Sequence, residues 1–167
     1  DVCDYYKFIC NENNCVASDY FNYAYYLKLN SLFELSLYNY QQALNRNISQ
    51  PEDVYLNMSV IYAEHLRDGT SAIDCLNKAL KVAPKFIAGL YNLGGMHEEL
   101  GDKGNAEKCF RDILAIEPEH ALAMARIFQF TAFSDKEDTL ILKAKILVNK
   151  PKIYLEEKVS LNYALGK

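Results

Sequence analysis

Apolar residues along this chain recur at the three- and four-residue spacing of amphipathic helices, and they nowhere alternate with polar residues over a useful length. The apolar stretches come in pairs, and short polar turns separate them. The pattern therefore predicts antiparallel helices and no strands. The expected helices span residues 17–29, 32–46, 52–66, 70–82, 86–100, 103–116, 119–133, 136–149 and 153–166.

Short blocks of similar sequence recur in the first helix of successive pairs. The block Leu90-Tyr91-Asn92-Leu93-Gly94 is preceded by Tyr55-Leu56-Asn57-Met58-Ser59, and before that, at the same interval, by Tyr20-Phe21-Asn22-Tyr23-Ala24. Pro84 and Pro118 close two of the pairs at corresponding places. Proline suits these places because it stops one helix and is tolerated in the first turn of the next. The chain is therefore expected to be a tandem array of helix pairs.

This array resembles the tetratricopeptide repeat, a helix–turn–helix unit of about 34 residues. The residues that carry the resemblance are Leu93, Gly94, Gly101, Ala106, Phe110, Ile113 and Pro118 in one unit, and Tyr55, Met58, Tyr62, Ala72, Leu76, Ala79 and Pro84 in the unit before it. The resemblance implies an all-α fold, a tetratricopeptide-repeat solenoid of antiparallel helix pairs forming a right-handed superhelix. The first helices of the pairs would line a concave groove, and the second helices would form the convex back.

The repeat frame also predicts how the chain is organised. We expect an N-terminal segment or cap at 1–16, helix pairs at 17–51, 52–84, 85–118 and 119–150 (the last divergent), and a solitary C-terminal helix at 151–167 that starts a further repeat. The chain opens without Met and ends inside an apolar periodic stretch, so we expect a fragment of a longer protein. The apolar face of the last helix, with Ile153, Leu161 and Leu165, is predicted to be uncovered, which would favour a homo-oligomer.

The predicted binding site is the groove lined by the first helices. Asn22, Asn57 and Asn92 occupy equivalent positions, and Arg126 stands one repeat after Asn92. Equivalent positions stack along a solenoid, and an asparagine amide offers a peptide backbone both a donor and an acceptor. The alternative is that these asparagines only keep the groove hydrated. The predicted groove residues are Asn22, Tyr25, Leu56, Asn57, Val60, Tyr91, Asn92, Arg126 and Gln129.

Aromatic side chains gather toward the N-terminal end of this groove, where they suit a bound peptide. In the alternative interpretation, Phe21 and Tyr25 are covered by the N-terminal segment. The many N-terminal tyrosines predict either an aromatic core between helices or a face that self-associates. The family's lysine-rich clamp for acidic C-terminal tails is poorly matched, because Leu56, Val60 and Leu122 stand where that clamp has polar or basic groups.

Composition and charge narrow the range of partners. The 167 residues are 50% hydrophobic and 24% charged, which excludes a disordered or fibrous chain. A net charge of −4 lacks the basic surface typical of proteins that bind nucleic acid or anionic membranes. No apolar run approaches the roughly 18 residues of a membrane-spanning helix. We therefore expect a protein or peptide ligand, with neither nucleic acid nor a membrane as a partner.

The cysteines favour a reducing compartment. There are five of them, an odd number, and none belongs to a Cys-x-x-Cys pair, so we expect free thiols and a cytoplasmic protein. Cys75 and Cys109 fall on helical faces, where a free cysteine is usually a small buried hydrophobe. For the cluster of Cys3, Cys10 and Cys15, a metal site or a disulfide is the alternative.

No enzyme motif is complete. His97-Glu98 lacks the second histidine that a zinc-protease helix carries one turn later. Gly94, Gly95 and Gly101 follow no predicted strand and precede no Gly-Lys-Ser/Thr, so they do not form a phosphate loop. We expect no catalytic residue, no cofactor and no metal. The sequence thus predicts a non-catalytic scaffold that binds a peptide or partner segment in its groove.

A second likeness lies at the C-terminal end. Residues 130–138, 144–147 and 162–167 resemble the linker region of bacterial proteins in which these repeats precede a sulfotransferase domain. The likeness implies an alternative function, in which the repeats recruit a substrate for a larger enzyme such as a sulfotransferase or another transferase. The catalytic domain would then lie outside these residues.

Overall fold

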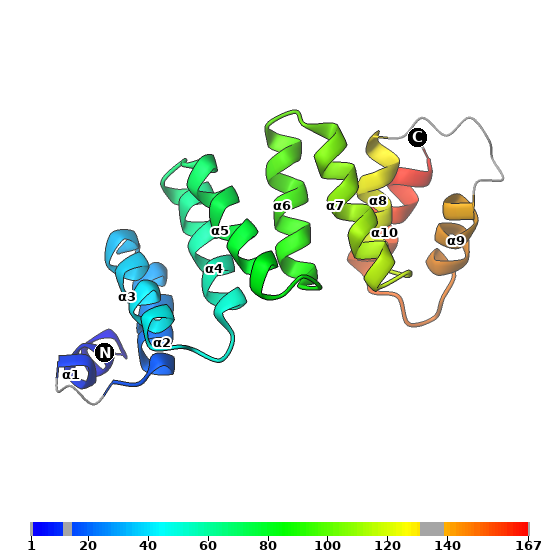
Figure 1. The fold of residues 1–167 in the computed structure, drawn as a ribbon. Coiled ribbons are helices and arrows are strands. Elements are labelled where there is room, and N and C mark those ends of the chain that lie inside the picture. The colour runs from blue at the N-terminus through cyan, green and yellow to red at the C-terminus, as the bar shows by residue number, and fades with distance from the viewer. Residues whose placement is uncertain (1, 12–14, 131–138, 167) are drawn as a thin grey trace. The chain divides into compact units, whose positions relative to one another are not determined.

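The computed structural model describes residues 2–11, 15–130 and 139–166, and every regular element within them is a helix (Figure 1). The helices are α1 (Val2–Asn11), α2 (Ala17–Leu29), α3 (Phe33–Asn45), α4 (Pro51–Val60), η1 (Ile61–His65), α5 (Gly69–Val82), α6 (Ile87–Glu99), α7 (Lys103–Ile116), α8 (Ala121–Phe130), α9 (Thr139–Val148) and α10 (Leu155–Leu165). The π-helical turn η1 continues α4, so the two together form the helix expected at 52–66. The expected all-α fold is confirmed, with helix ends within a few residues of prediction. The parts of the expected helices that fall in 131–138 lie outside the described residues.

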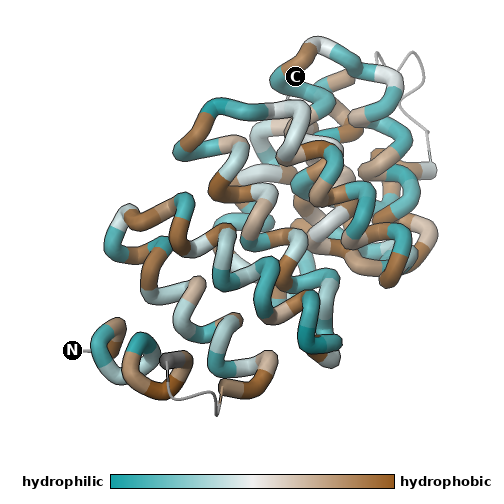
Figure 2. Tube along the Cα trace, turned by 60° about the vertical axis from the view of Figure 1, so that its left-hand side comes forward, coloured by the Kyte–Doolittle hydropathy of each residue, from teal (hydrophilic) through white to brown (hydrophobic). Residues whose placement is uncertain are grey.

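The chain divides into two compact units, Asp1–Gly89 and Leu90–Lys167, which are described separately. Hydrophobic and hydrophilic residues interleave along the helices of both units (Figure 2). This is the pattern of helices that bury one side and expose the other. None of the described helices is both long enough and apolar enough to cross a membrane.

The first unit contains two helix pairs, α2 with α3 and α4–η1 with α5, preceded by α1. Its core contains Ala24, Tyr40, Val54, Met58, Ile61 and Cys75. Small residues lie where the helices cross. Ser36 of α3 is fully buried, and its hydroxyl donates to the carbonyl of Ala24 at 2.6 Å. Ala72 of α5 is also fully buried, so the small-residue positions of the repeat do act as crossing points.

Helix α1 covers part of the tyrosine-rich face of α2. The ring of Tyr6 stacks on those of Tyr23 and Tyr26, with centroids 6.4 and 5.8 Å apart. Tyr23 and Tyr26 are three residues apart and so share one face of α2. Phe21 packs against the core instead, and Tyr25 stays 42% exposed. The N-terminal segment therefore covers Tyr23 and Tyr26 rather than Phe21 and Tyr25, and the alternative interpretation of that pair is wrong.

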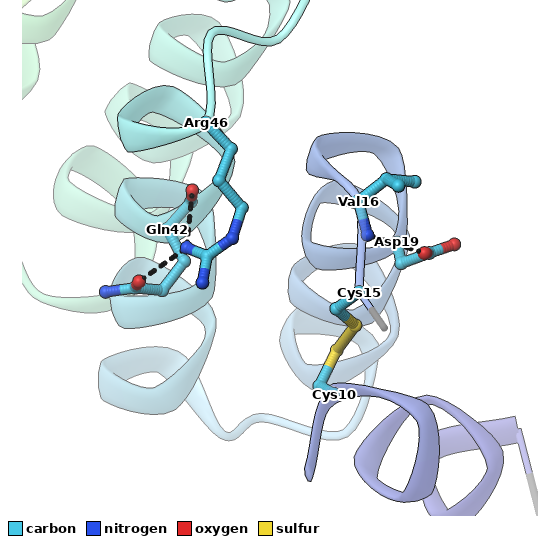
Figure 3. Close-up of a disulfide and its surroundings, with 6 residues drawn as sticks. All are labelled: Cys10, Cys15, Val16, Asp19, Gln42 and Arg46. Carbon is cyan, nitrogen blue, oxygen red and sulfur yellow. Dashed lines mark hydrogen bonds between the residues drawn. A yellow bond between two sulfur atoms is a disulfide. The ribbon is translucent and has the colours of Figure 1, made fainter. Parts of the chain in front are cut away.

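A disulfide joins Cys10, near the end of α1, to Cys15, just before α2 (Figure 3). The next residue, Val16, donates its backbone N–H to the Asp19 carboxylate at 3.0 Å and so begins α2. The expectation of free thiols is wrong for these two cysteines, and the alternative of a disulfide is the one that the structure shows. The two cysteines are five residues apart in the sequence, and their sulfurs meet at the connection between α1 and α2.

The other three cysteines are free thiols. Cys75 and Cys109 are buried, as expected, and burial raises the pKa of the Cys75 thiol to about 11. Cys3 is partly exposed, and its sulfur accepts a hydrogen bond from the Asn30 side chain at 3.4 Å. Because two of the five cysteines are bridged, the cysteines favour a reducing compartment less strongly than the sequence alone indicates.

Aspartates cap the second helices of two consecutive repeats. The carboxylate of Asp68 accepts from the Ser71 backbone N–H at 3.0 Å, and that of Asp102 accepts from the Asn105 backbone N–H at 3.1 Å. Side-chain hydrogen bonds from Ser71 and Asn105 are the main cause that holds the pKa of each carboxyl below its usual value. The two caps occupy equivalent positions, so the repeat frame also sets where these helices begin.

Replacing Asp68 by alanine is expected to lower the melting temperature at neutral pH, because α5 loses its cap. A carboxyl whose pKa is lower in the folded state stabilises the fold above its unfolded pKa, and that contribution is lost as pH falls through the folded pKa. The difference between wild type and variant should therefore shrink as the pH drops below the ordinary value of 3.8. Circular dichroism melts measure it, with Asp112→Ala, an exposed aspartate of α7, as the control. If both variants lose the same amount of thermal stability at every pH, the capping role of Asp68 is contradicted.

The second unit contains α7, α8, α9, α10 and the part of α6 from Leu90 onward. Its core contains Ala121, Met124, Ala125, Phe128, Ala144, Leu147, Val148, Leu161 and Ala164. Helices α6 and α7 cross at Gly94, where a Cβ atom would lie only 2.8 Å from the fully buried ring of Phe110. The glycine of the repeat motif is thus a packing requirement.

Helix α10 lies beside α8 (Figure 1) and also contacts α9. Leu161 is fully buried, and Ile153 and Leu165 pack against the same core. The expectation that this face lies uncovered is therefore wrong. The physical reason is that α10 takes the place of a first helix of the next pair and so packs back against α8, the first helix before it. The argument for a homo-oligomer through this face is removed with it.

Candidate functional site

The predicted site residues all lie on the first helix of a pair. We call the surface that the first helices present within each unit its first-helix face: α2 and α4 carry it in the first unit, and α6, α8 and α10 carry it in the second. Asn22 and Tyr25 lie on α2, Leu56, Asn57 and Val60 on α4, Tyr91 and Asn92 on α6, and Arg126 and Gln129 on α8. None of these residues is fully buried. The first unit therefore holds five of them and the second unit four, and each unit has its own polar cluster.

In the first unit, Lys28 links α2 to α4. Its ammonium donates to the Asn57 side-chain oxygen at 2.8 Å and lies 5.2 Å from the centroid of the Tyr25 ring. Burial lowers the pKa of Lys28. The Asn57 amide nitrogen donates to the Asp53 carbonyl at 2.9 Å. One amide hydrogen and one oxygen lone pair of Asn57 then remain for a ligand.

Lys28 was not among the predicted site residues, although it stands three residues after Tyr25 and therefore on the same face of α2. Equivalence between repeats could not reveal it, because no other repeat has a lysine at that place. It places a positive charge next to two predicted residues, Tyr25 and Asn57.

In the second unit, Arg126 of α8 is held by two residues of α6. Its Nε donates to the Tyr91 hydroxyl at 3.4 Å, and its Nη1 lies 3.3 Å from a Glu98 carboxylate oxygen. The hydrogen bond with Tyr91 is the main cause that raises the pKa of Arg126. The Glu98 side chain is only 17% exposed, and burial raises its pKa while Arg126 opposes that shift. Arg126 is thus already paired, which weakens any attraction for an acidic tail.

A pocket of about 220 Å³ opens between α8 and α10. It is lined by Tyr91, Leu122, Ala125, Arg126, Gln129, Glu156, Ser160 and Tyr163. Three pairs of these residues stand exactly one repeat apart: Leu122 and Glu156, Arg126 and Ser160, Gln129 and Tyr163. Equivalent positions of α8 and α10 do therefore meet on one surface.

The α10 side of this pocket was missed by the sequence prediction. The signal was present, because adding one repeat to Arg126 and Gln129 leads directly to Ser160 and Tyr163. The last helix was expected to be an open end of the array rather than a part of the site. Two other depressions, of about 550 Å³ beside Pro84 and about 180 Å³ beside Pro118, contain no predicted site residue.

The described residues hold no group of three or more histidine, cysteine or acidic side chains placed to bind a metal ion. His97 lies 3.6 Å from Asp102, the residue that caps α7. This geometry is that of a helix end. The chemistry available on the first-helix face is hydrogen bonding, charge pairing and aromatic contact.

Comparison with known proteins identifies the repeat. Residues 52–86 and 87–120 each match the model of the tetratricopeptide repeat. The chain therefore contains tetratricopeptide repeats, and the expectation drawn from the sequence is confirmed to that extent. No curated protein matches the chain by sequence.

Several solved structures with a similar fold are titled as tetratricopeptide-repeat proteins. MamA is 12% identical, with 97% of this chain and 85% of that chain covered and a TM-score of 0.69. YrrB, titled a TPR protein with an unusual peptide-binding site, is 13% identical, with 99% and 82% covered and a TM-score of 0.68. A tetratricopeptide repeat protein from Parabacteroides merdae is 19% identical, with 99% and 66% covered and a TM-score of 0.70. At these identities the likeness shows the fold.

Proposed function

We propose that this chain is a non-catalytic protein-interaction scaffold whose first-helix face binds an extended peptide or partner segment. The observation that carries the proposal is the pocket between α8 and α10, where equivalent positions of two first helices bring polar and aromatic side chains to one partly exposed surface. Tetratricopeptide repeats form an interaction fold, and one protein of similar fold, YrrB, is titled as having a peptide-binding site. The proposed groove residues remain Asn22, Tyr25, Leu56, Asn57, Val60, Tyr91, Asn92, Arg126 and Gln129.

The asparagines are proposed to bind the ligand's backbone. Asn57 keeps a donor and an acceptor after its contacts with Lys28 and Asp53. A backbone-directed contact does not depend on the ligand's side chains, so it would serve an extended segment of varied sequence. Partners of other classes are not part of the proposal, because the net charge of −4 does not favour nucleic acid or anionic membranes.

Replacing Asn57 and Asn92 together by alanine should weaken peptide binding about tenfold or more, since each lost contact is worth about 0.5–1.5 kcal/mol. The probe is a random twelve-residue peptide library selected against the wild-type protein, followed by fluorescence anisotropy with the selected peptides. The matched control replaces Asn77 and Asn149 together by alanine. Asn77 lies on α5 and Asn149 just after α9, which are second helices of their pairs, so this variant should bind like wild type. If the Asn57/Asn92 variant binds the peptide as tightly as wild type, the two asparagines contribute only to packing and hydration.

A role as the substrate-recruiting part of a larger enzyme, such as a sulfotransferase or another transferase, is the alternative proposal. Its support is the sequence likeness at the C-terminal end, of which residues 131–138 lie outside the described part of the structure. The two roles are separated by the full-length sequence: a nucleotide-sulfate site in it would favour recruitment, and further repeats would favour the scaffold.

A further inference from the structure

The pocket between α8 and α10 carries an unbalanced negative charge. Arg126 contributes one positive charge, but Glu98 lies 3.3 Å from it and cancels that charge. Glu156, from the first turn of α10, also lines the pocket, and no hydrogen bond or ion pair joins it to another described residue. The charges of the described side chains at the pocket therefore add up to about −1 at neutral pH.

The size and the lining of the pocket limit what it can hold. Its volume is about 220 Å³, below the range of about 300–1,000 Å³ found for pockets that enclose a whole small ligand. It suits one long side chain. Tyr91 and Tyr163 line it, and aromatic rings attract cations. Ser160 adds a hydroxyl that can accept a hydrogen bond from a donor such as an ammonium or a guanidinium.

We propose that this pocket binds a single lysine or arginine side chain of the partner segment, with the Glu156 carboxylate as its counter-charge. The proposal rests on the proposed function, since it assumes that a segment lies on the first-helix face. It names the chemistry that the second unit recognises, and it is opposite in sign to a clamp for acidic tails.

The competing side chains fit less well. An acidic side chain would face the Glu156 carboxylate, and the positive charge of Arg126 that could attract it is already balanced by Glu98, 3.3 Å away. An apolar side chain would remove water from Glu156 and Ser160 without offering them hydrogen bonds. A basic side chain satisfies Glu156 and leaves the pair of Arg126 and Glu98 intact.

The test uses the same random peptide library, selected against the whole chain. Lysine or arginine should be enriched at one position of the selected peptides, and its replacement by glutamine should weaken binding about tenfold or more. Glu156→Gln should weaken the basic peptide to a similar extent and abolish the difference between the lysine and glutamine peptides. Glu117→Gln, an exposed glutamate of the same unit that does not line the pocket, makes the same change of charge and should leave the affinity within about twofold.

Ser160→Leu provides a second variant, because it fills the pocket without changing its charge. It should weaken the basic peptide while circular dichroism shows an unchanged helix content. Enrichment of acidic or apolar residues, or a Glu156→Gln variant that still prefers lysine to glutamine, would overturn the assignment of the pocket and leave peptide binding in place. Failure of the library to yield any binding peptide would overturn the proposed function as well.

Discussion

Gly94→Ala is expected to lower the free energy of unfolding by about 1–3 kcal/mol, the usual cost of forcing an extra methyl group into a packed site. The new Cβ would lie 2.8 Å from the ring of Phe110. That ring is fully buried, with Tyr91 against it at 5.6 Å and Phe130 stacked on it at 6.2 Å between centroids. Because the ring has no room to move, α6 and α7 must separate to admit the methyl group.

Gly95→Ala is the matched control one residue later. Apart from its two chain neighbours and the backbone of its own helix, no heavy atom of the described residues lies within 4 Å of the Cβ position at Gly95. Alanine there should raise stability by about 0.5–1 kcal/mol, because glycine is a poor helix former. Urea unfolding followed by circular dichroism measures both variants. If both substitutions raise stability equally, Gly94 is not the close crossing that the repeat requires.

Leu161→Ala should cost about 2–5 kcal/mol, the range for truncating a buried leucine. Leu161 is fully buried in the core that α8, α9 and α10 share. Its loss removes the main anchor of α10, and α10 supplies Glu156, Ser160 and Tyr163 to the pocket. The variant should therefore lose both stability and binding of the basic peptide.

Val159→Ala tests the opposite face of the same helix. Val159 is 59% exposed, so its truncation should change stability by no more than about 0.5 kcal/mol. Hydrogen–deuterium exchange would show faster exchange across α10 in Leu161→Ala only. Equal effects of the two substitutions would mean that α10 is not anchored through Leu161.

The helices were predictable because the same pattern of residues recurs in each repeat and so marks the same helix position several times. Asn22, Asn57 and Asn92 share a frame, and that frame alone places α2, α4 and α6. The small residue at Gly94 and the large one at Phe110 could likewise be assigned to a crossing from the repeat pattern. These features depend on local spacing, which the sequence records directly.

Features that depend on a partner from outside the frame were missed. Helix α1 precedes the first repeat, so no block of similar sequence elsewhere in the chain indicated that residues 2–11 form a helix. The disulfide between Cys10 and Cys15 joins α1 to α2, and an odd number of cysteines gave no reason to choose that pair. Lys28 acts on the site through Asn57, 29 residues away, a contact between helices that periodicity does not encode.

The C-terminal helix shows how a correct element can be given the wrong role. Its bounds were predicted closely, and its apolar residues Leu161 and Leu165 were identified. The error was to treat the helix as an open end, when its equivalence to α8 meant that these residues pack inward. The same equivalence would have predicted Ser160 and Tyr163 as site residues.

The central claim is that the first-helix face is the binding surface, and chemical-shift mapping tests it most directly. The ¹⁵N-labelled protein would be titrated with a peptide selected from the random library. We expect the largest amide shifts on first helices, around Asn57, Tyr91, Arg126 and Ser160. The second helices, around Tyr38, Asn77 and Lys108, should change little. Shifts concentrated on the second helices, with the first-helix face unperturbed, would contradict the claim.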